Sequence, residues 1–341
     1  MCSSDLSLRE YGNMNFSVVT NQFWSLIVSG LALGFIYVLI SLGYTMVYGV
    51  LRLINFANSE IFMVGTFATV VVSRNFYKFN QNTDPLHGTK LVLVLLSFLL
   101  ASMLMSGITA VLVELVAYRR LRAKGTNRLA SLISAIGTSI VLQEGVRILT
   151  HSTPWSNPRV IRKYDVITFG KTGIRNDILI VLLFAAALYF AIDRFVSKTL
   201  LGKAIRAVSM SEETSRLMGI NLNRVISATF FIGGITTGAA AFLYETVYEN
   251  TKYNVGFAIG LAAFTAAVLG GIGNIRGAFY GGLTLGLLEV FIAAILGTQW
   301  KSVTVFVVLV LVLLFKPNGL FGEAITQSRV DRKSTRLNSS H

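Results

Sequence analysis

Four polar side chains occupy nine positions between two apolar runs: Arg52, Asn55, Asn58 and Glu60. Polar groups at membrane depth are costly, and they are tolerated where they line a cavity or satisfy the backbone of an interrupted helix. We therefore expect a broken or re-entrant helix near 51–60, in which Asn55 and Asn58 replace lost backbone hydrogen bonds and Glu60 lies at the positive end of the next span. A tight cytoplasmic turn anchored by Arg52 is the alternative.

Motifs of known enzyme or metal chemistry are absent from the sequence. There is no G-x-x-x-x-G-K-[ST] phosphate loop, and the glycine-rich stretch at 270–277 lies between two apolar runs rather than between a strand and a helix. There is no H-E-x-x-H pattern and no cysteine pair, and His87, His151 and His341 lie outside the apolar runs. The sequence predicts no catalytic residue, no metal site and no directly bound cofactor.

The composition is typical of a membrane protein. Of the 341 residues, 53% are hydrophobic and 13% charged, where a soluble domain has roughly 25% charged residues. The apolar residues form blocks close to the ~20 residues that a membrane-spanning helix needs. We expect an all-α, polytopic transmembrane bundle of eight or nine spans, one or two of them re-entrant. The candidate spans are 23–50, 58–73, 91–118, 129–149, 177–193, 225–244, 254–272, 277–297 and 302–315.

Basic residues in the loops predict the orientation of these spans. The short loop 119–128 holds five basic residues and no acid, so it should be cytoplasmic, and 194–224 then falls on the same side. The loop 151–175 should be external although it also holds five basic residues, which is a conflict with the rule. The net charge of +14 forms no basic stripe with interleaved aromatics, so anionic lipid rather than nucleic acid is the expected partner.

Both ends of the sequence are polar and lack periodicity. The stretches MCSSDL and RKSTRLNSSH resemble translated sequencing-adapter read-through, so we expect 1–13 and 332–341 to be non-native and the natural start to be Met14. The membrane domain would then cover 14–322, followed by a polar tail at 323–341.

Small residues recur at four-residue spacing, which places them on one face of a helix. Helices associate in lipid by close backbone approach, so these faces are expected to pack against other helices. Sliding surfaces between moving helices are the alternative. The glycines are Gly30, Gly34, Gly234, Gly238, Gly277 and Gly281, with Gly282 and Gly286 following.

The predicted cytoplasmic loop 198–224 is expected to form two short helices. Ser211 suits the N-cap of the second helix, Glu212 and Glu213 suit its positive end, and Gly219 suits the left-handed residue that terminates it. An apolar tip beside basic residues is typical of docking by a soluble partner, and a solvated loop is the alternative. The tip consists of Leu217, Met218 and Ile220, beside Arg206 and Arg216.

Five separated stretches carry a family resemblance. They are GLALGFIYVLISLGYTMVYGVLRLINFANSEIFMVGTF, LISAIGTSIVLQE, LGKAIRAVSMSEETSRLMGIN, AVLGGIGNIRGAFYGGLTLGLLE and LFKPNGLFG. In this order, over about 23–322, they strongly resemble the inner-membrane permeases of bacterial branched-chain amino acid ABC importers. Family members more often have His-Gly where this chain has Asn58-Ser59, so no role of a histidine is carried over.

The resemblance implies a multi-pass inner-membrane permease with several partners. These are a second related permease, two cytoplasmic ATPase subunits that use the ATP, and an extracytoplasmic substrate-binding protein. It also implies that 202–220 is the coupling loop that docks on the ATPase. The implied coupling residues are Gly202, Arg206, Glu212, Glu213, Leu217 and Gly219, and the candidates for the translocation path or broken helix are Asn55, Asn58 and Glu60.

Other functions remain open at this point. A permease of the same family for urea or short amides fits nearly as well. A secondary transporter would need charged residues in mid-span, whereas Glu114 and Glu289 lie near span ends. Glu144 and Arg147 are three residues apart on one helix, which predicts an internal pair rather than a substrate contact.

Overall fold

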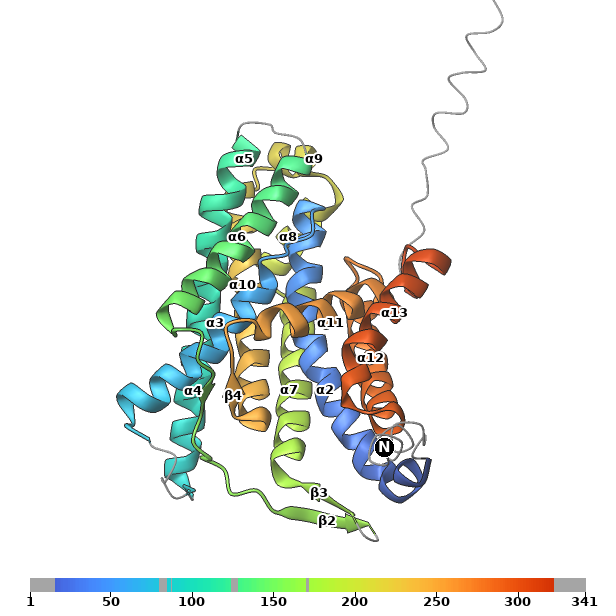
Figure 1. The fold of residues 1–341 in the computed structure, drawn as a ribbon. Coiled ribbons are helices and arrows are strands. Elements are labelled where there is room, and N and C mark those ends of the chain that lie inside the picture. The colour runs from blue at the N-terminus through green and yellow to red at the C-terminus, as the bar shows by residue number, and fades with distance from the viewer. Residues whose placement is uncertain (1–15, 80–84, 87, 124–127, 170–171, 322–341) are drawn as a thin grey trace, which may run out of the picture.

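The computed structural model describes residues 16–79, 85–86, 88–123, 128–169 and 172–321. Within these residues the chain forms a bundle of helices with a few short strands (Figure 1). The predicted start at Met14 and the predicted non-native tails lie outside the described residues, as does the polar stretch 323–341.

The helices follow the apolar blocks of the sequence. They are α2 (Phe16–Leu51), α3 (Asn58–Val71) with the π-helical η1 (Val72–Phe76), α4 (Thr89–Val113) with the π-helical η2 (Glu114–Arg119), α5 (Arg120–Ala123), α6 (Arg128–Leu149), α7 (Asn176–Lys198), α8 (Leu200–Met210), α9 (Glu212–Leu217), α10 (Leu222–Tyr248), α11 (Val255–Gly270), α12 (Ile275–Leu296), the 3₁₀ turn η3 (Thr298–Trp300) and α13 (Lys301–Phe315). The strands are β1 (Trp155–Ser156), β2 (Asp165–Phe169), β3 (Thr172–Arg175) and β4 (Asn250–Thr251).

Seven of the described helices are long and apolar enough to cross a membrane. The helix α11 has 16 residues and α3 has 14, so at 1.5 Å per residue they extend about 24 and 21 Å, less than a ~30 Å hydrocarbon core. Each predicted span coincides with one of these seven helices or with α3 or α11. The prediction of an all-α polytopic bundle is therefore confirmed, and its helices are consistent with eight or nine spans.

The loops separate to the two ends of the bundle. Figure 1 shows α5, α8 and α9 together at one end and the β2–β3 hairpin at the other, so the two basic loops predicted to be cytoplasmic share one end. The strand β1 pairs antiparallel with β4, and β2 with β3. In the loop 151–175, which the sequence predicts to be external, Arg159 and Lys163 both pair with Glu249. This pairing offsets part of the positive charge that made the loop conflict with the orientation rule.

The chain is not helical between Leu51 and Asn58. Arg52 has a φ of +51°, which ends α2, and the chain then folds back along it. The Nδ2 of Asn58 donates to the carbonyl of Ile40 at 3.4 Å, three turns before the end of α2. The helix is therefore broken at 52–57, as expected, with a turn at Arg52, and α3 then begins inside the bundle.

Small residues join α4 to α3 and α10. A β-carbon on Gly234 would lie 2.6 Å from the β-carbon of Ala110, so the helix backbones are close together. The Ser102 hydroxyl donates to the carbonyls of Gly65 at 2.9 Å and Gly238 at 2.7 Å. Hydrogen bonds of this kind and close backbone approach replace the hydrophobic effect as the force that joins helices in lipid.

Candidate functional site

Two helices begin side by side inside the bundle. The first turn of α3 touches the first two turns of α11 at Ser59: β-carbons on Gly256 and Gly260 would both overlap this residue, so only glycine permits the approach. Neither helix has a side-chain cap at its N-terminus. The positive ends of two helix dipoles therefore meet at one place, which we call the α3–α11 junction (Ser59, Glu60, Gly256 and Gly260).

Glu60 is the ionisable group of this junction and is 1% exposed. Its Oε1 accepts hydrogen bonds from Ser59 at 3.3 Å and from Ser139 of α6 at 3.5 Å. Its Oε2 has no hydrogen-bond partner and faces the first turn of α11, where a β-carbon on Gly256 would lie 2.9 Å away. The junction thus contains a buried carboxylate with one uncommitted oxygen.

Asn55 and Asn58 connect the break to its surroundings. The Oδ1 of Asn55 accepts hydrogen bonds from the backbone N–H of Ala57 at 3.2 Å and the hydroxyl of Tyr118 at 3.0 Å. The Oδ1 of Asn58 accepts from the hydroxyl of Thr237 at 3.3 Å. Both side chains are buried, so in this conformation they support the interrupted backbone and do not line an open channel.

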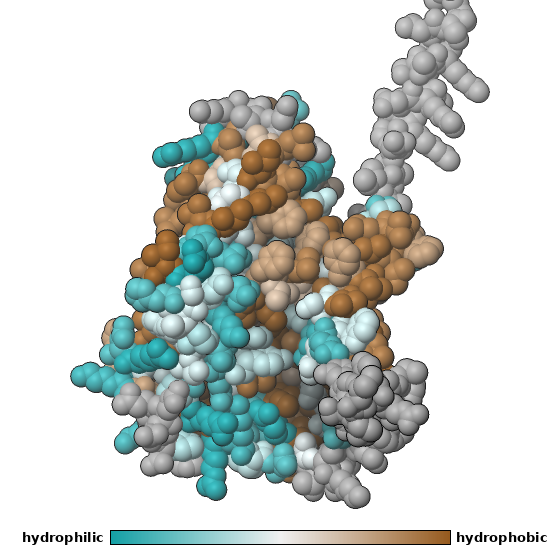
Figure 2. Space-filling view, viewed as in Figure 1, coloured by the Kyte–Doolittle hydropathy of each residue, from teal (hydrophilic) through white to brown (hydrophobic). Residues whose placement is uncertain are grey.

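The face of the bundle that carries α11 and β4 is polar at mid-height. Figure 2 shows hydrophilic and neutral residues over its centre, with apolar residues beside it over α13 and the upper part of α6. Lys252 and Asn254, just before α11, are exposed. Polar surface at membrane depth is costly against lipid tails, so this face is suited to contact with water or protein.

The segment 198–224 folds as two short helices with the capping that the sequence indicates. The Oγ of Ser211 accepts a hydrogen bond from the N–H of Thr214 at 3.2 Å, and Gly219 has a φ of +81°. Leu217 and Met218 are 83% and 78% exposed at the tip of the segment 199–220, which we call the coupling hairpin after its predicted role. Two large apolar side chains at a loop tip form a surface that a partner protein can cover.

The other predicted coupling residues lie on both sides of this hairpin. Glu212, Glu213 and Arg206 are exposed, and Arg206 donates to the carbonyl of Ser197 at 2.9 Å. Gly202 is buried, and a β-carbon there would overlap Val196, so this glycine sets the tight corner between α7 and α8. Gly202 thus positions the hairpin and lies away from its exposed surface.

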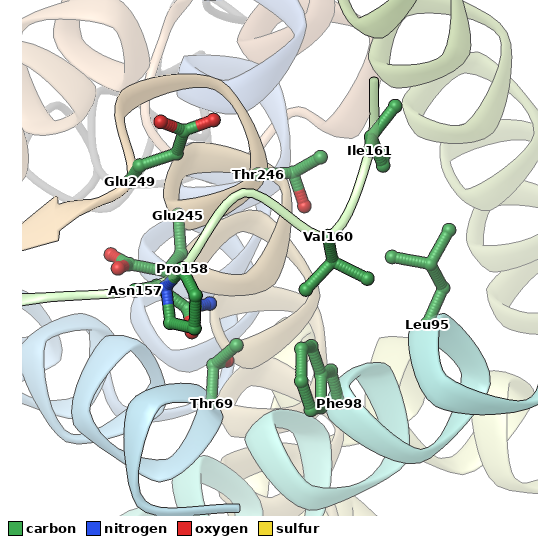
Figure 3. Close-up of a pocket in the computed structure, with 10 residues that line it drawn as sticks. All are labelled: Thr69, Leu95, Phe98, Asn157, Pro158, Val160, Ile161, Glu245, Thr246 and Glu249. Carbon is green, nitrogen blue, oxygen red and sulfur yellow. The ribbon is translucent and has the colours of Figure 1, made fainter. Parts of the chain in front are cut away.

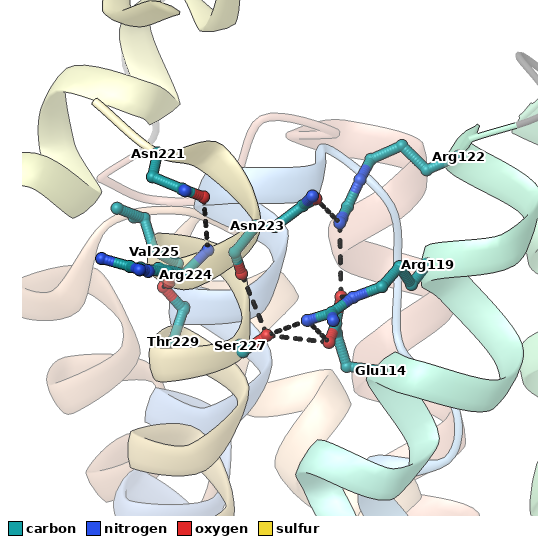
Figure 4. A network of polar contacts seen from close by, with 9 residues as sticks. All are labelled: Glu114, Arg119, Arg122, Asn221, Asn223, Arg224, Val225, Ser227 and Thr229. Atoms are coloured by element: carbon teal, nitrogen blue, oxygen red, sulfur yellow. Dashed lines mark hydrogen bonds and ion pairs between the residues drawn. The ribbon is translucent and has the colours of Figure 1, made fainter. Parts of the chain in front are cut away.

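A buried ion network joins the basic loop to the start of α10 (Figure 4). Glu114, fully buried, accepts hydrogen bonds from Arg119 at 3.0 Å, Arg122 at 3.3 Å and Ser227 at 2.9 Å. Arg122 also donates to the Oδ1 of Asn223 at 2.9 Å. The exit of the coupling hairpin is thereby tied to η2 and α5. Sequence reasoning missed this network, although three basic residues within 119–122 and the nearby Glu114 were a visible signal.

Two further carboxylates have partners. The Tyr37 hydroxyl donates to Glu289 at 2.6 Å and joins α2 to α12, a contact between residues too far apart in sequence to be predicted. Glu144 and Arg147 form the predicted pair on one helix face, at 2.5 Å. Neither of these two contacts involves Glu60.

A small cavity lies under the loop 151–175, predicted to be external (Figure 3). Asn157 and Ile161 of this loop, Thr69 of α3 and Glu245 of α10 contribute to its lining. Its volume is about 20 Å³, enough for one water molecule and far too small for an amino acid. Within the described ranges, no group of three or more His, Cys, Asp or Glu side chains is placed to hold a metal ion.

Comparisons with known proteins identify relatives along most of the chain. The profile of the family described as "Branched-chain amino acid transport system / permease component" matches residues 26–313. The permease protein BraD of Pseudomonas aeruginosa, of a high-affinity branched-chain amino acid transport system, is 38% identical over 87% of this chain and 94% of that protein. The permease protein LivH of Escherichia coli, named for the same kind of system, is 37% identical over 86% of this chain and 94% of that protein.

One solved structure is also similar. A chain of PsaBC from Streptococcus pneumoniae in complex with Fab has a TM-score of 0.38 and 14% identity, over 91% of this chain and 97% of that chain. A TM-score at this level does not define the fold.

Proposed function

This chain belongs to the family of branched-chain amino acid transport permeases, and from this membership we propose that it is the membrane subunit of an ATP-driven importer of branched-chain amino acids. It is a multi-pass protein of the bacterial inner membrane and a permease, not an enzyme. In this proposal it works with a related permease, two ATPase subunits that bind and hydrolyse the ATP, and an extracytoplasmic binding protein.

The ATP-driven mechanism is supported most directly by one contact, which Arg52 makes with the end of α8. The guanidinium of Arg52 donates to the carbonyls of Ser209 and Met210, both at 3.2 Å, at the C-terminal end of α8. The coupling hairpin is therefore attached directly to the break that leads into α3. An ATPase that grips Leu217 and Met218 and moves the hairpin would pull on the start of α3 and so on the α3–α11 junction.

Uptake by the assembled importer tests this function. The chain is co-expressed with the neighbouring genes for a permease, the ATPases and a binding protein, and the assembled importer is reconstituted in liposomes. Uptake of labelled leucine and of labelled urea is then measured with ATP and without it. We expect ATP-dependent leucine uptake. Leucine uptake by the two permeases without any ATPase would overturn the mechanism, and uptake of urea alone would select the rival substrate.

Labelling tests the orientation on which the mechanism depends. A cysteine introduced by Met218→Cys lies at the exposed tip of the coupling hairpin. We expect a membrane-impermeant thiol reagent to label it in inside-out vesicles and not in intact cells stripped of their outer membrane. Labelling only from the outside would exclude docking of a cytoplasmic ATPase there.

A further inference from the structure

We propose that the α3–α11 junction binds the charged backbone of a free α-amino acid, with Glu60 receiving the ammonium group and the N-terminal turns of α3 and α11 receiving the carboxylate. The inference rests on the proposed function and narrows it, because it names the chemical class of substrate that the permease itself recognises. Urea and simple amides carry neither charge.

The ammonium half of the site follows from the state of Glu60. The ion pairs formed by the described residues take up Glu114, Glu144, Asp177 and Glu249, and none includes Glu60. A buried carboxylate without a cationic partner is costly, and a positively charged ligand removes that cost. The uncommitted Oε2 lies against Gly256, where a β-carbon would be 2.9 Å away, so the backbone of α11 covers this oxygen in the present conformation.

The carboxylate half follows from the two helix ends. First turns without a side-chain cap leave backbone N–H groups directed along the helix axis, and unpaired N–H groups of this kind bind anions. In the first turn of α3 the N–H groups of Asn58 and Glu60 already donate to the carbonyls of Asn55 and Ala57, so the N–H of Ser59, beside α11, is the donor for the carboxylate. Both α3 and α11 lack a side-chain cap, and they touch at Ser59. Helices that begin within the membrane are used in this way for anionic substrate groups in other transport proteins.

An aromatic cluster beside the junction suits the remainder of the substrate. The ring of Phe264 on α11 lies 5.9 Å from the ring of Tyr44 and 5.8 Å from that of Phe56, centroid to centroid. The hydroxyl of Tyr44 lies 3.3 Å from the position of a β-carbon on Gly260, so the cluster borders the junction directly. It offers an apolar surface for a branched aliphatic side chain.

Access to the site requires movement. Glu60 is closed off from solvent in this conformation, and the two first turns touch through glycines without interlocking side chains. A small displacement of α11 from α3 therefore exposes Oε2 and both helix ends at once. The attachment of Arg52 to α8 provides the mechanical connection for such a displacement.

The principal test replaces Glu60 by its neutral isostere. Glu60→Gln keeps the size of the side chain and removes the charge; the matched control is Glu245→Gln, because Glu245 is also buried and unpartnered but lines the cavity under the loop 151–175. In the reconstituted importer we expect Glu60→Gln to assemble and to lower leucine uptake at least about tenfold, which corresponds to about 1.4 kcal/mol. Leucine uptake by Glu245→Gln should stay within about twofold of the wild type.

Wild-type uptake by Glu60→Gln would overturn the site while leaving the proposed function intact. A wild type without leucine uptake would overturn the function itself.

A second measurement does not depend on the variant. Ligands that bind the folded state raise the thermal unfolding midpoint. The wild-type importer without binding protein is heated with L-leucine, with 4-methylpentanoate, which lacks the ammonium, and with 3-methylbutylamine, which lacks the carboxylate. We expect leucine to raise the midpoint and each analogue to raise it less. If 4-methylpentanoate raises the midpoint as much as leucine does, ammonium recognition by Glu60 is excluded. Because this measurement uses the wild type, it decides the question even if Glu60→Gln fails to assemble.

Discussion

Gly286 of α12 packs directly on Gly34 of α2: a β-carbon at position 286 would overlap the backbone of Gly34. The contact is reciprocal, because a β-carbon on Gly34 would lie 3.0 Å from the Cα of Leu283 and one on Gly30 would lie 3.1 Å from the Cα of Leu287. The similar stretches GLALG and GLTLG, at 30–34 and 282–286, thus meet face to face in helices that run in opposite directions.

The stability of this contact is the first prediction. Gly286→Ala forces α2 and α12 apart, since backbone and not a flexible side chain occupies the space, and it should destabilise the protein by about 1–3 kcal/mol. The control is Gly137→Ala in α6, where nothing lies within 4 Å of the added carbon, and it should be neutral or slightly stabilising. Thermal unfolding in detergent measures both. Equal midpoints for Gly286→Ala and the wild type would mean that the helices do not need this approach.

These glycines show which part of the fold could be predicted from sequence. The spacing of Gly30 and Gly34, of Gly234 and Gly238 and of Gly277 and Gly281 predicts flat helix faces, and in the structure these glycines lie close to neighbouring helices. It could not indicate partners that are distant in sequence: Gly34 meets Leu283 of α12, and Gly238 meets Ser102 of α4.

The same division applies to the candidate site. The Ser211 cap and the positive φ of Gly219 were predictable, because each depends on a few neighbouring residues. The meeting of α3 and α11 was not, since Ser59 and Gly256 carry no mutual signal in a single sequence. The role of these groups in transport stays a prediction.

Glu114 provides the second prediction, by comparison with Glu144. Glu114 is fully buried beside Arg119 and Arg122, whose side chains are partly exposed, whereas Glu144 and Arg147 are both 44% exposed. Glu114→Gln should therefore cost about 1–3 kcal/mol, and Glu144→Gln less than about 1 kcal/mol. Denaturant unfolding of the purified importer at low and high salt measures this. If Glu144→Gln lost more free energy of unfolding than Glu114→Gln, the exposed pair and not the buried network would be the stabilising one.

Gly219 provides the third prediction. Its φ of +81° opposes any β-branched residue, while a β-carbon there would meet no other atom, so the effect of substitution is purely one of backbone conformation. Gly219→Val should abolish co-purification of the ATPase with normal membrane insertion, and Gly219→Asn, which accepts this conformation, should retain most of it. If Gly219→Val keeps the ATPase bound as tightly as Gly219→Asn does, the shape of the hairpin is not what the partner recognises.

Asn55 provides the fourth prediction. Asn55→Leu removes the acceptor for both Ala57 N–H and the hydroxyl of Tyr118, and two buried donors then lack a partner. We expect leucine uptake to fall at least about fivefold with the chain still inserted, and Tyr118→Phe, which removes only one donor, to have a smaller effect. Uptake at the wild-type level in Asn55→Leu would show that the segment is a simple turn with no part in transport.

Arg52 provides the last prediction, because it separates ATP hydrolysis from transport. Its side chain is exposed, so its removal should alter the overall stability little, yet it holds the end of α8 through the carbonyls of Ser209 and Met210. A loss of about 1 kcal/mol in coupling corresponds to about a fivefold effect. Arg52→Ala should therefore lower leucine uptake per ATP hydrolysed about fivefold while the ATPase subunits remain bound and active. Arg52→Lys keeps a cation near the negative end of α8, so its leucine uptake per ATP hydrolysed should lie between those of the wild type and Arg52→Ala. Uptake and phosphate release measured on the same liposomes give the ratio directly, and an unchanged ratio in Arg52→Ala would mean that movement reaches α3 by another route.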